Sequence, residues 1–317
     1  MRALGRTGLK VSPIGLGLAS LGRPGYINLG HGDDLAGQTA VEAMERNAQE
    51  VLDAAFEGGV RYFDAARSYG RAEAFLASWL ERRGLSSGEA TVGSKWGYTY
   101  VGGWRVDADP AEVKDLSVET LRRQAEESRA LLGGDLRLYQ IHSATVESGV
   151  LDDRKVLDEL GRVREDGLVI GASVTGPEQA ETIRHAVAAG LFDAVQATWN
   201  LLERSAGPAL AEAHAAGLGV IVKEALANGR LTARGGDTLV ETIAAERRVT
   251  PDALALAAAL AQPWADVVLS GATTVEQLRS NLAALDVDYN DELDRRLAPL
   301  VEDPTGYWES RAALPWN

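Results

Sequence analysis

Eight short apolar segments, separated by longer segments of helical periodicity, constrain the fold of this sequence more than any other feature. The predicted strands cover residues 12–19, 60–66, 91–96, 136–142, 169–174, 194–200, 219–224 and 267–271. They are nearly continuous apolar runs, as is typical of parallel strands that helices cover. Such alternation of strands with helical segments indicates a parallel sheet joined by crossover helices.

The segments between the strands carry amphipathic helix patterns and helix-start signals. Helices are expected over residues 40–57, 117–132, 153–165 and 177–189, several of them opening with a capping residue or an N1 proline. No Pro- or Ser-rich linker separates the eight units, and no G-x-G-x-x-G motif follows the first strand. We therefore predict one domain over residues 1–317, a closed (β/α)8 TIM barrel rather than an open doubly wound sheet.

Three segments lie outside this repeat. Residues 1–10 could form a short hairpin that closes the barrel floor. The long excursion over residues 22–38 follows the first strand, and loops in that position lie at the catalytic face of a barrel, so it is expected to form a lid or a substrate wall. The C-terminal tail, which ends Pro315-Trp316-Asn317, is expected to lie over the same face.

Composition excludes several classes of function. There is no cysteine, and the four histidines, His31, His142, His185 and His214, lack the close spacing of metal ligands, so no metal site is expected. The net charge of −14 argues against a nucleic-acid binder. We find no apolar run long enough to cross a bilayer and no secretory signal at the start, and we expect a cytoplasmic protein.

Four polar residues fall at or just beyond the ends of three successive predicted strands: Asp64, Tyr69, Lys95 and His142. Each alone has a structural explanation, such as capping, rim charge or core packing. Together they are better explained as an active site than by four separate structural roles. Strand ends converge on one mouth of a barrel, and unpaired charge is costly there. A tyrosine beside a lysine suits proton donation to a carbonyl oxygen, since an ammonium lowers the tyrosine pKa. Asp64 would hold Lys95 charged and oriented.

The sequence resembles the aldo-keto reductase superfamily over nearly its whole length. The resemblance rests on Leu4 to Ser12, on Ile14-Gly15-Leu16-Gly17, and on Phe63-Asp64-Ala65-Ala66 through Ser68-Tyr69-Gly70 to Glu73. Ser94-Lys95 and Leu138-Tyr139-Gln140-Ile141-His142 match the remaining members of the family's catalytic tetrad. The resemblance implies hydride transfer from a nicotinamide cofactor to a carbonyl carbon, with Tyr69 giving the proton.

The resemblance also implies cofactor-binding residues. Ser173 and Gln196 match positions that bind the nicotinamide carboxamide, and Trp199 stands where a family aromatic stacks on the nicotinamide ring, with core packing as its alternative role. Near the end of the chain, the sequence resembles the family segment that binds the adenosine phosphates, which consists of a strand, a turn and the start of a helix. The residues expected to bind the cofactor there are Gly271, Thr273, Thr274, Gln277 and Asn281.

Two departures from the family pattern bear on these assignments. Val174 replaces the usual asparagine beside the serine, so one carboxamide contact is either missing or supplied by another residue. Lys223 and Glu224 replace the usual aromatic residue and serine after the seventh strand. Lys223 could reach a cofactor phosphate or could form a rim ion pair with Glu224, and the sequence favours neither.

The cofactor and the substrate are less constrained. The family pattern favours NADPH, but Gly271, Thr274 and Gln277 occupy positions where Lys or Arg would pair with a 2′-phosphate, and only Arg279 is nearby, which leaves NADH as an alternative. Trp96, Tyr98 and Tyr26 are the expected substrate residues, and aromatic walls suit a neutral aldehyde, ketone or sugar.

Three classes of function follow. The first is an NAD(P)H-dependent reductase of a small carbonyl or sugar, or the same chemistry run as an NAD-dependent dehydrogenase. The second is a nicotinamide-binding regulatory subunit with little turnover, against which the complete tetrad argues. The third, a lyase or hydrolase, would need paired carboxylates or a metal cluster, and the predicted strand ends offer neither.

Overall fold

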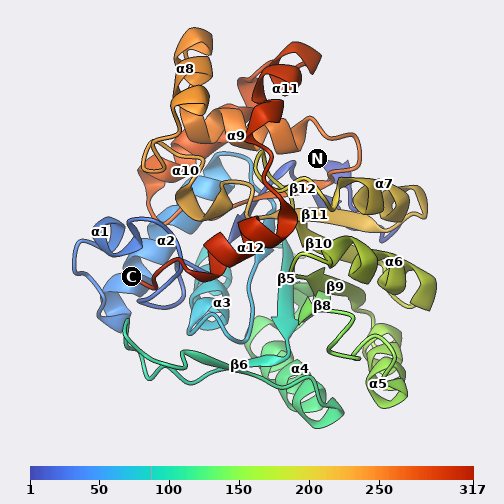
Figure 1. Ribbon diagram of the computed structural model, residues 1–317. Coiled ribbons are helices and arrows are strands. Elements are labelled where there is room, and N and C mark those ends of the chain that lie inside the picture. Colours follow the sequence, from blue (N-terminus) through green and yellow to red (C-terminus); the bar gives the residue numbers. More distant parts are fainter. Residues whose placement is uncertain (87) are drawn as a thin grey trace.

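The computed structural model describes residues 1–86 and 88–317, and it contains the predicted barrel. Eight parallel strands close into a ring in the order β3, β4, β5, β8, β9, β10, β11 and β12, with β12 paired to β3 (Figure 1). Their bounds are β3 (Ile14–Gly17), β4 (Tyr62–Asp64), β5 (Thr91–Trp96), β8 (Leu136–Ala144), β9 (Val169–Val174), β10 (Ala194–Thr198), β11 (Gly219–Lys223) and β12 (Val267–Ser270). All eight predicted strands are confirmed; β3 starts later than expected, after Pro13, which has no N–H for a ladder hydrogen bond.

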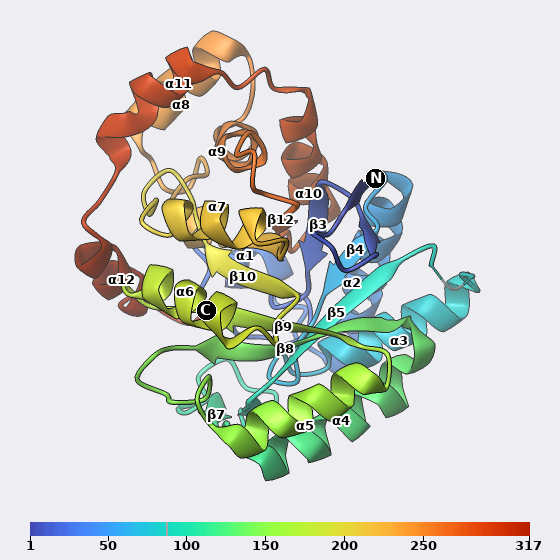
Figure 2. The same ribbon diagram turned by 90° about the vertical axis from the view of Figure 1, so that its right-hand side faces the viewer.

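Helices surround the strands, as Figure 2 shows from the side. The helices after the first strand are α1 (His31–Leu35), α2 (Val41–Glu57), α3 (Ala72–Arg83), α4 (Val118–Leu132), α5 (Arg154–Glu165), α6 (Gln179–Ala189), α7 (Gly207–Ala215), α8 (Thr238–Arg247), α9 (Pro251–Leu260), α10 (Val275–Leu282), α11 (Asp291–Leu297) and α12 (Pro304–Ala312). Two predicted caps form: the Ser117 side chain accepts the Thr120 amide at the start of α4, and Asp153 accepts the Lys155 and Val156 amides at the start of α5.

Alternate residues of each strand face the barrel interior, and the others face the helices. The floor of the interior is an apolar cluster that includes Tyr62, Leu138 and Ile221. A hairpin of β1 (Arg2–Ala3) and β2 (Lys10–Val11) closes this end, with Leu4 and Val11 in the same cluster, as the sequence predicts. Gly93 cannot be replaced without strain, because a Cβ there would collide with the Tyr62 hydroxyl.

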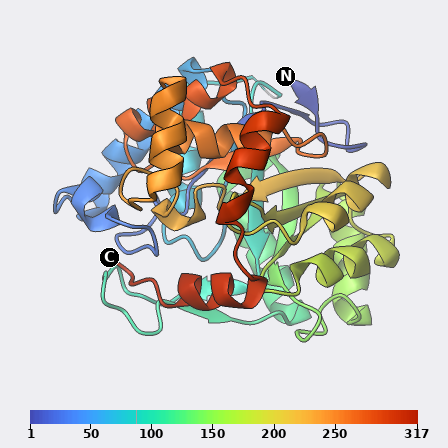
Figure 3. The ribbon, with the colours of Figure 1, turned by 45° about the horizontal axis from the view of Figure 1, so that its top comes forward.

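The opposite end of the barrel is the mouth, where the strands end. A second hairpin, β6 (Tyr98–Tyr100) with β7 (Glu112–Lys114), follows β5 at this end. Helix α12 crosses the barrel in Figure 1, and Figure 3 shows it leading to the C-terminus apart from the ring of helices. The C-terminal Asn317 exchanges backbone hydrogen bonds of 3.2 Å with Tyr26. The tail thus covers the catalytic face, as expected.

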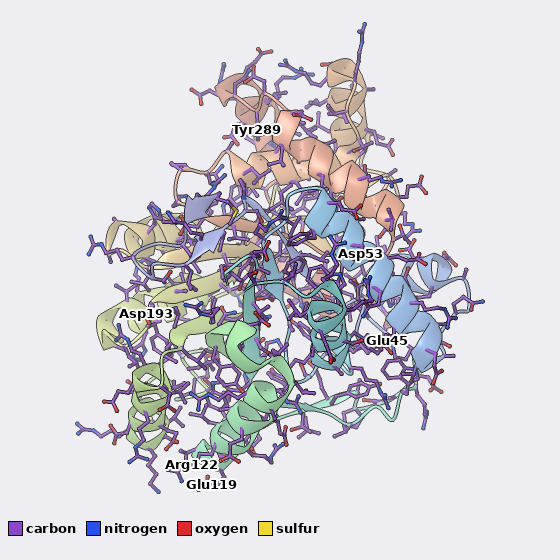
Figure 4. The ribbon with its side chains drawn as sticks, turned by 180° about the vertical axis from the view of Figure 1, so that it is seen from behind. Glu45, Asp53, Glu119, Arg122, Asp193 and Tyr289 are labelled. Carbon is purple, nitrogen blue, oxygen red and sulfur yellow. The ribbon has the colours of Figure 1, made fainter. Side chains whose placement is uncertain are left out.

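Charge lies mainly on the outside of the helical ring. Glu45 on α2 and Glu119 and Arg122 on α4 project away from the barrel in Figure 4.

Within the described residues, no helix is both long and apolar enough to span a membrane.

Candidate active site

A cavity of about 280 Å³ opens at the barrel mouth. Three residues of the predicted constellation, Asp64, Tyr69 and His142, line it together with Gln196 from β10. Residues of the excursion over 22–38 and of the tail also line it, among them Tyr26 and Trp316. In the part of the chain that the structure describes, no group of three or more potential metal-ligating side chains is found.

A buried hydrogen-bond network surrounds the Asp64 carboxylate. It accepts hydrogen bonds from Lys95 Nζ, from the Tyr62 hydroxyl at 3.0 Å, from Gln196 Nε2 at 3.0 Å and from Gln140 Nε2 at 3.4 Å. Lys95 Nζ also donates to the Ala65 carbonyl at 3.0 Å. All of these donors come from inward positions of the barrel strands, so the strand register fixes the orientation of Lys95.

Tyr69 lies next to this network. Lys95 Nζ is 5.0 Å from the centre of the Tyr69 ring, and the His142 ring meets it edge to face at 5.4 Å. Its hydroxyl makes no hydrogen bond with any described residue. Burial, and then the Asp64 carboxylate, raise the pKa of Tyr69, with Arg23 opposing them. The expected net lowering of this pKa by Lys95 is not found, because burial of the hydroxyl and the Asp64 charge together outweigh the ammonium.

His142 is a neutral imidazole at pH 7. Burial lowers its pKa well below the ordinary value, and Lys95, Lys223 and Arg23 lower it further. Its Nδ1 lies 3.4 Å from Ser68 Oγ. A neutral ring can donate one hydrogen bond to a substrate oxygen but does not act as a charged acid.

Arg23 is a site residue that the sequence pattern missed. It is 3% exposed, and its Nη1 donates to the Ser68 carbonyl at 3.0 Å and to Glu112 at 2.8 Å. Its guanidinium lies 4.5 Å from the centre of the Trp316 ring and 5.6 Å from that of Tyr69. The excursion was expected at the mouth, but nothing in its sequence marks Arg23 as the buried member.

Lys223 and Glu224 do not pair with each other. A rim ion pair with Glu224 was one of the two roles considered for Lys223. Glu224 instead pairs with Arg311 of α12, whose Nε lies 2.8 Å from Glu224 Oε2 and 3.0 Å from Oε1. Burial opposes the charge, but Arg311 and then Lys223 lower the pKa of Glu224 to about 2. Lys223 lines the cavity, and no described carboxylate lies within ion-pair distance of it; burial lowers its pKa to about 8.

Two tryptophans assigned to the site lie in the core and not at the cavity. Trp96 and Trp199 are 0% and 3% exposed and belong to the core between strands and helices, where Trp199 meets Trp264 edge to face at 5.8 Å. Both occupy outward positions, next to the inward Lys95 and Thr198, so neither fits the expected substrate or stacking role. Val174, which stands in place of the family's asparagine, also faces the helices.

The other two expected substrate residues lie at the mouth. Tyr26 lines the cavity, and Tyr98 contacts His142 edge to face at 5.0 Å.

The residues expected at the nicotinamide end fit a carboxamide group. Ser173 and Gln196 are register partners on β9 and β10, both at inward positions. Ser173 is 1% exposed, and its hydroxyl has no hydrogen-bond partner among the described residues. Such a buried, unpaired hydroxyl is costly unless a ligand binds it, and a carboxamide offers both a donor and an acceptor.

A second cavity, of about 490 Å³, lies beside the first one, near the start of α10. Four of the expected residues line it: Gly271, Thr274, Gln277 and Asn281. A Cβ on Gly271 would meet no atom within 4 Å, so the chain leaves open space there. Thr273 does not line either cavity; its hydroxyl lies 3.4 Å from His31 Nδ1.

Comparisons with known proteins agree with this geometry. The chain is 28% identical to the uncharacterized oxidoreductase YrpG of Bacillus subtilis, over 99% of this chain and 98% of that protein. It is 26% identical to the NADH-specific methylglyoxal reductase of Escherichia coli, over 94% and 98%. The solved structure of an aldo-keto reductase from Bacillus halodurans shares the fold, with a TM-score of 0.72, 21% identity and coverage of 95% and 96%. The model of the Aldo/keto reductase family matches residues 13–299, and this chain therefore belongs to that family of NAD(P)H-dependent oxidoreductases.

Proposed function

We propose that this protein reduces the carbonyl group of a small aldehyde, ketone or sugar, with Tyr69 as the proton donor. The observation that carries the proposal is the uncommitted Tyr69 hydroxyl in the mouth cavity, flanked by Lys95 and His142. A nicotinamide nucleotide bound in the cavity would supply the hydride. Among the described residues that line the cavity, the carboxylates Asp64, Glu112 and Glu224 are each bonded to a cation and do not form the carboxylate pair of a hydrolase.

The side chains of the cavity have separate tasks in this proposal. Tyr69 is protonated at neutral pH and so has a proton to give to the substrate oxygen; because burial raises its pKa, the transfer would depend on stabilisation of the resulting phenolate. Neutral His142 donates a hydrogen bond to the same oxygen and orients the carbonyl group. Lys95, fixed by Asp64, places a positive charge 5.0 Å from the Tyr69 ring and stabilises the phenolate that proton transfer leaves.

Cofactor placement follows from the unpaired groups of the barrel mouth. Ser173 and Gln196 would hold the carboxamide, and the open backbone at Gly271 would admit the phosphates between the two cavities. Lys223 would hold an anionic oxygen of the cofactor. The family pattern favours NADPH, whereas the E. coli relative is named as NADH-specific.

The test is Tyr69→Phe, with Tyr139→Phe as the matched control. Tyr139 belongs to the core between β8 and the helices, and its hydroxyl is buried away from the cavity. We expect Tyr69→Phe to lower kcat for methylglyoxal and simple aldoses by about 10² to 10⁴, the usual contribution of a general acid. Nucleotide binding, followed by tryptophan fluorescence, should not change, and the control should keep full turnover. Assays in both directions would reveal a dehydrogenase; unchanged turnover in Tyr69→Phe would remove Tyr69 from the mechanism.

A further inference from the structure

The two cavities adjoin each other, and together they are called the trough. Asn28, Leu226 and Gly271 line both of them. On the proposed function, nicotinamide lies in the first cavity, beside Tyr69. A dinucleotide that reaches along the trough must then place its adenosine half in the second cavity.

The two ends of the trough differ in charge. In the first cavity the lining charges balance, because three cations, Arg23, Lys223 and Arg311, stand beside three carboxylates, Asp64, Glu112 and Glu224. The second is lined by Asp34, Asp252 and Glu276, and among the described residues around it Arg234 is the only cation. A phosphate at the second end would therefore meet a surplus of negative charge.

Arg234 is already committed to Asp34. Its Nη1 donates to Asp34 Oδ2 at 2.8 Å and to the carbonyls of Leu29 and Gly30 at 3.0 and 3.1 Å. Gln277, one of the positions where a cation would select a 2′-phosphate, instead donates its Nε2 to Asp34 Oδ2 at 2.8 Å. The Asp34 side chain is only 6% exposed, so its charge is poorly screened by water.

We infer that Asp34 makes the second cavity select NADH over NADPH. A 2′-phosphate carries about 1.5 to 2 negative charges near pH 7, and here it would face a buried carboxylate with no free cation to pair with. A ribose 2′-hydroxyl can donate a hydrogen bond to a carboxylate, as acidic residues do in other NAD sites. This reverses the preference for NADPH that the family pattern suggests.

The experiment is a parallel titration of the protein with NADH and NADPH, followed by quenching of tryptophan fluorescence. We expect NADPH to bind at least about tenfold more weakly, since even 1.4 kcal/mol of like-charge repulsion is tenfold in Kd. Asp34→Asn should reduce the ratio of the two Kd values by a similar factor. The ratio is the readout, because a general loosening of this segment would weaken both nucleotides alike.

The matched control is Asp33→Asn, which removes the same charge from the preceding, exposed residue of α1 and should leave the ratio unchanged. Equal or tighter binding of NADPH by the original protein would overturn the inference. So would a selective loss of NADPH binding in Arg234→Met, because Arg234 would then be a phosphate ligand. Binding of neither nucleotide would instead overturn the proposed function itself.

Discussion

Replacing Arg311 with methionine should destabilise the protein substantially. The change keeps much of the side-chain bulk but leaves the Glu224 carboxylate, 9% exposed, without the partner that holds it at 2.8 Å. The pKa of Glu224 falls from 4.5 to about 2 in the folded protein, which corresponds to about 3 kcal/mol in favour of the charged form. We therefore expect a loss of about 3 kcal/mol at pH 7, within the range for breaking a buried ion pair.

Urea unfolding followed by far-ultraviolet circular dichroism measures this loss. The stabilisation is fully present above the unfolded pKa of 4.5 and is lost as pH falls towards 2, because the folded pKa is the lower one. The difference between the original protein and Arg311→Met should therefore shrink below about pH 5.

The control is Arg184→Met. Arg184 also makes a two-pronged pair with Glu212, at 2.7 and 3.0 Å, but both side chains are about half exposed. No measurable loss of stability is expected there, because water screens the pair. Equal effects of the two substitutions, or an Arg311→Met effect that does not depend on pH, would refute the reasoning from burial.

Three further substitutions separate structural from functional roles. Lys223→Met should raise stability by about 3 kcal/mol at pH 7, because burial of an ammonium without a carboxylate partner is costly. The gain should shrink above about pH 8, where the original amine loses its proton, and nucleotide affinity should fall; a loss of stability would mean that Lys223 is paired after all. Trp199→Ala should cost about 3 to 5 kcal/mol in urea unfolding with unchanged nucleotide affinity, and the opposite pattern would restore its stacking role. Ser173→Ala should weaken nucleotide binding about tenfold in fluorescence titrations, as expected for one hydrogen bond to a ligand, while the Tm without nucleotide should not fall, because an unpaired buried hydroxyl is removed; unaltered affinity would leave the Ser173 hydroxyl without a ligand.

The strand and helix pattern was predictable because it depends on local periodicity. Each of the eight predicted strands is present, and Ser117 and Asp153 cap the helices that they were expected to start. What the pattern could not give is the direction of each side chain. Strands buried on both faces are apolar throughout, so the sequence does not distinguish the inward Lys95 from the outward Trp96, nor the inward Thr198 from the outward Trp199.

The sequence also did not predict which charged side chains pair with one another around the site. The Glu224 and Arg311 pair joins residues 87 positions apart, and Asp34 meets Gln277 across 243 positions. Nothing local marks either contact, since both depend on how the excursion and the tail fold back over the mouth. The expectation for the Tyr69 pKa failed for the same reason, because the burial of its hydroxyl, which raises the pKa most, depends on the folded mouth and not on local sequence.

The segment from Tyr26 to Asp34 has a kinetic consequence. It is bonded to Asn228 through the Leu29 amide at 3.0 Å, to Arg234 and Gln277 through Asp34, and to the tail through Asn317. On the proposed function, a nucleotide in the trough would contact this segment, which lines both cavities, and its exchange would require several of these bonds to open together. Product release, rather than hydride transfer, would then limit the steady-state rate, and the first turnover after rapid mixing would appear as a burst.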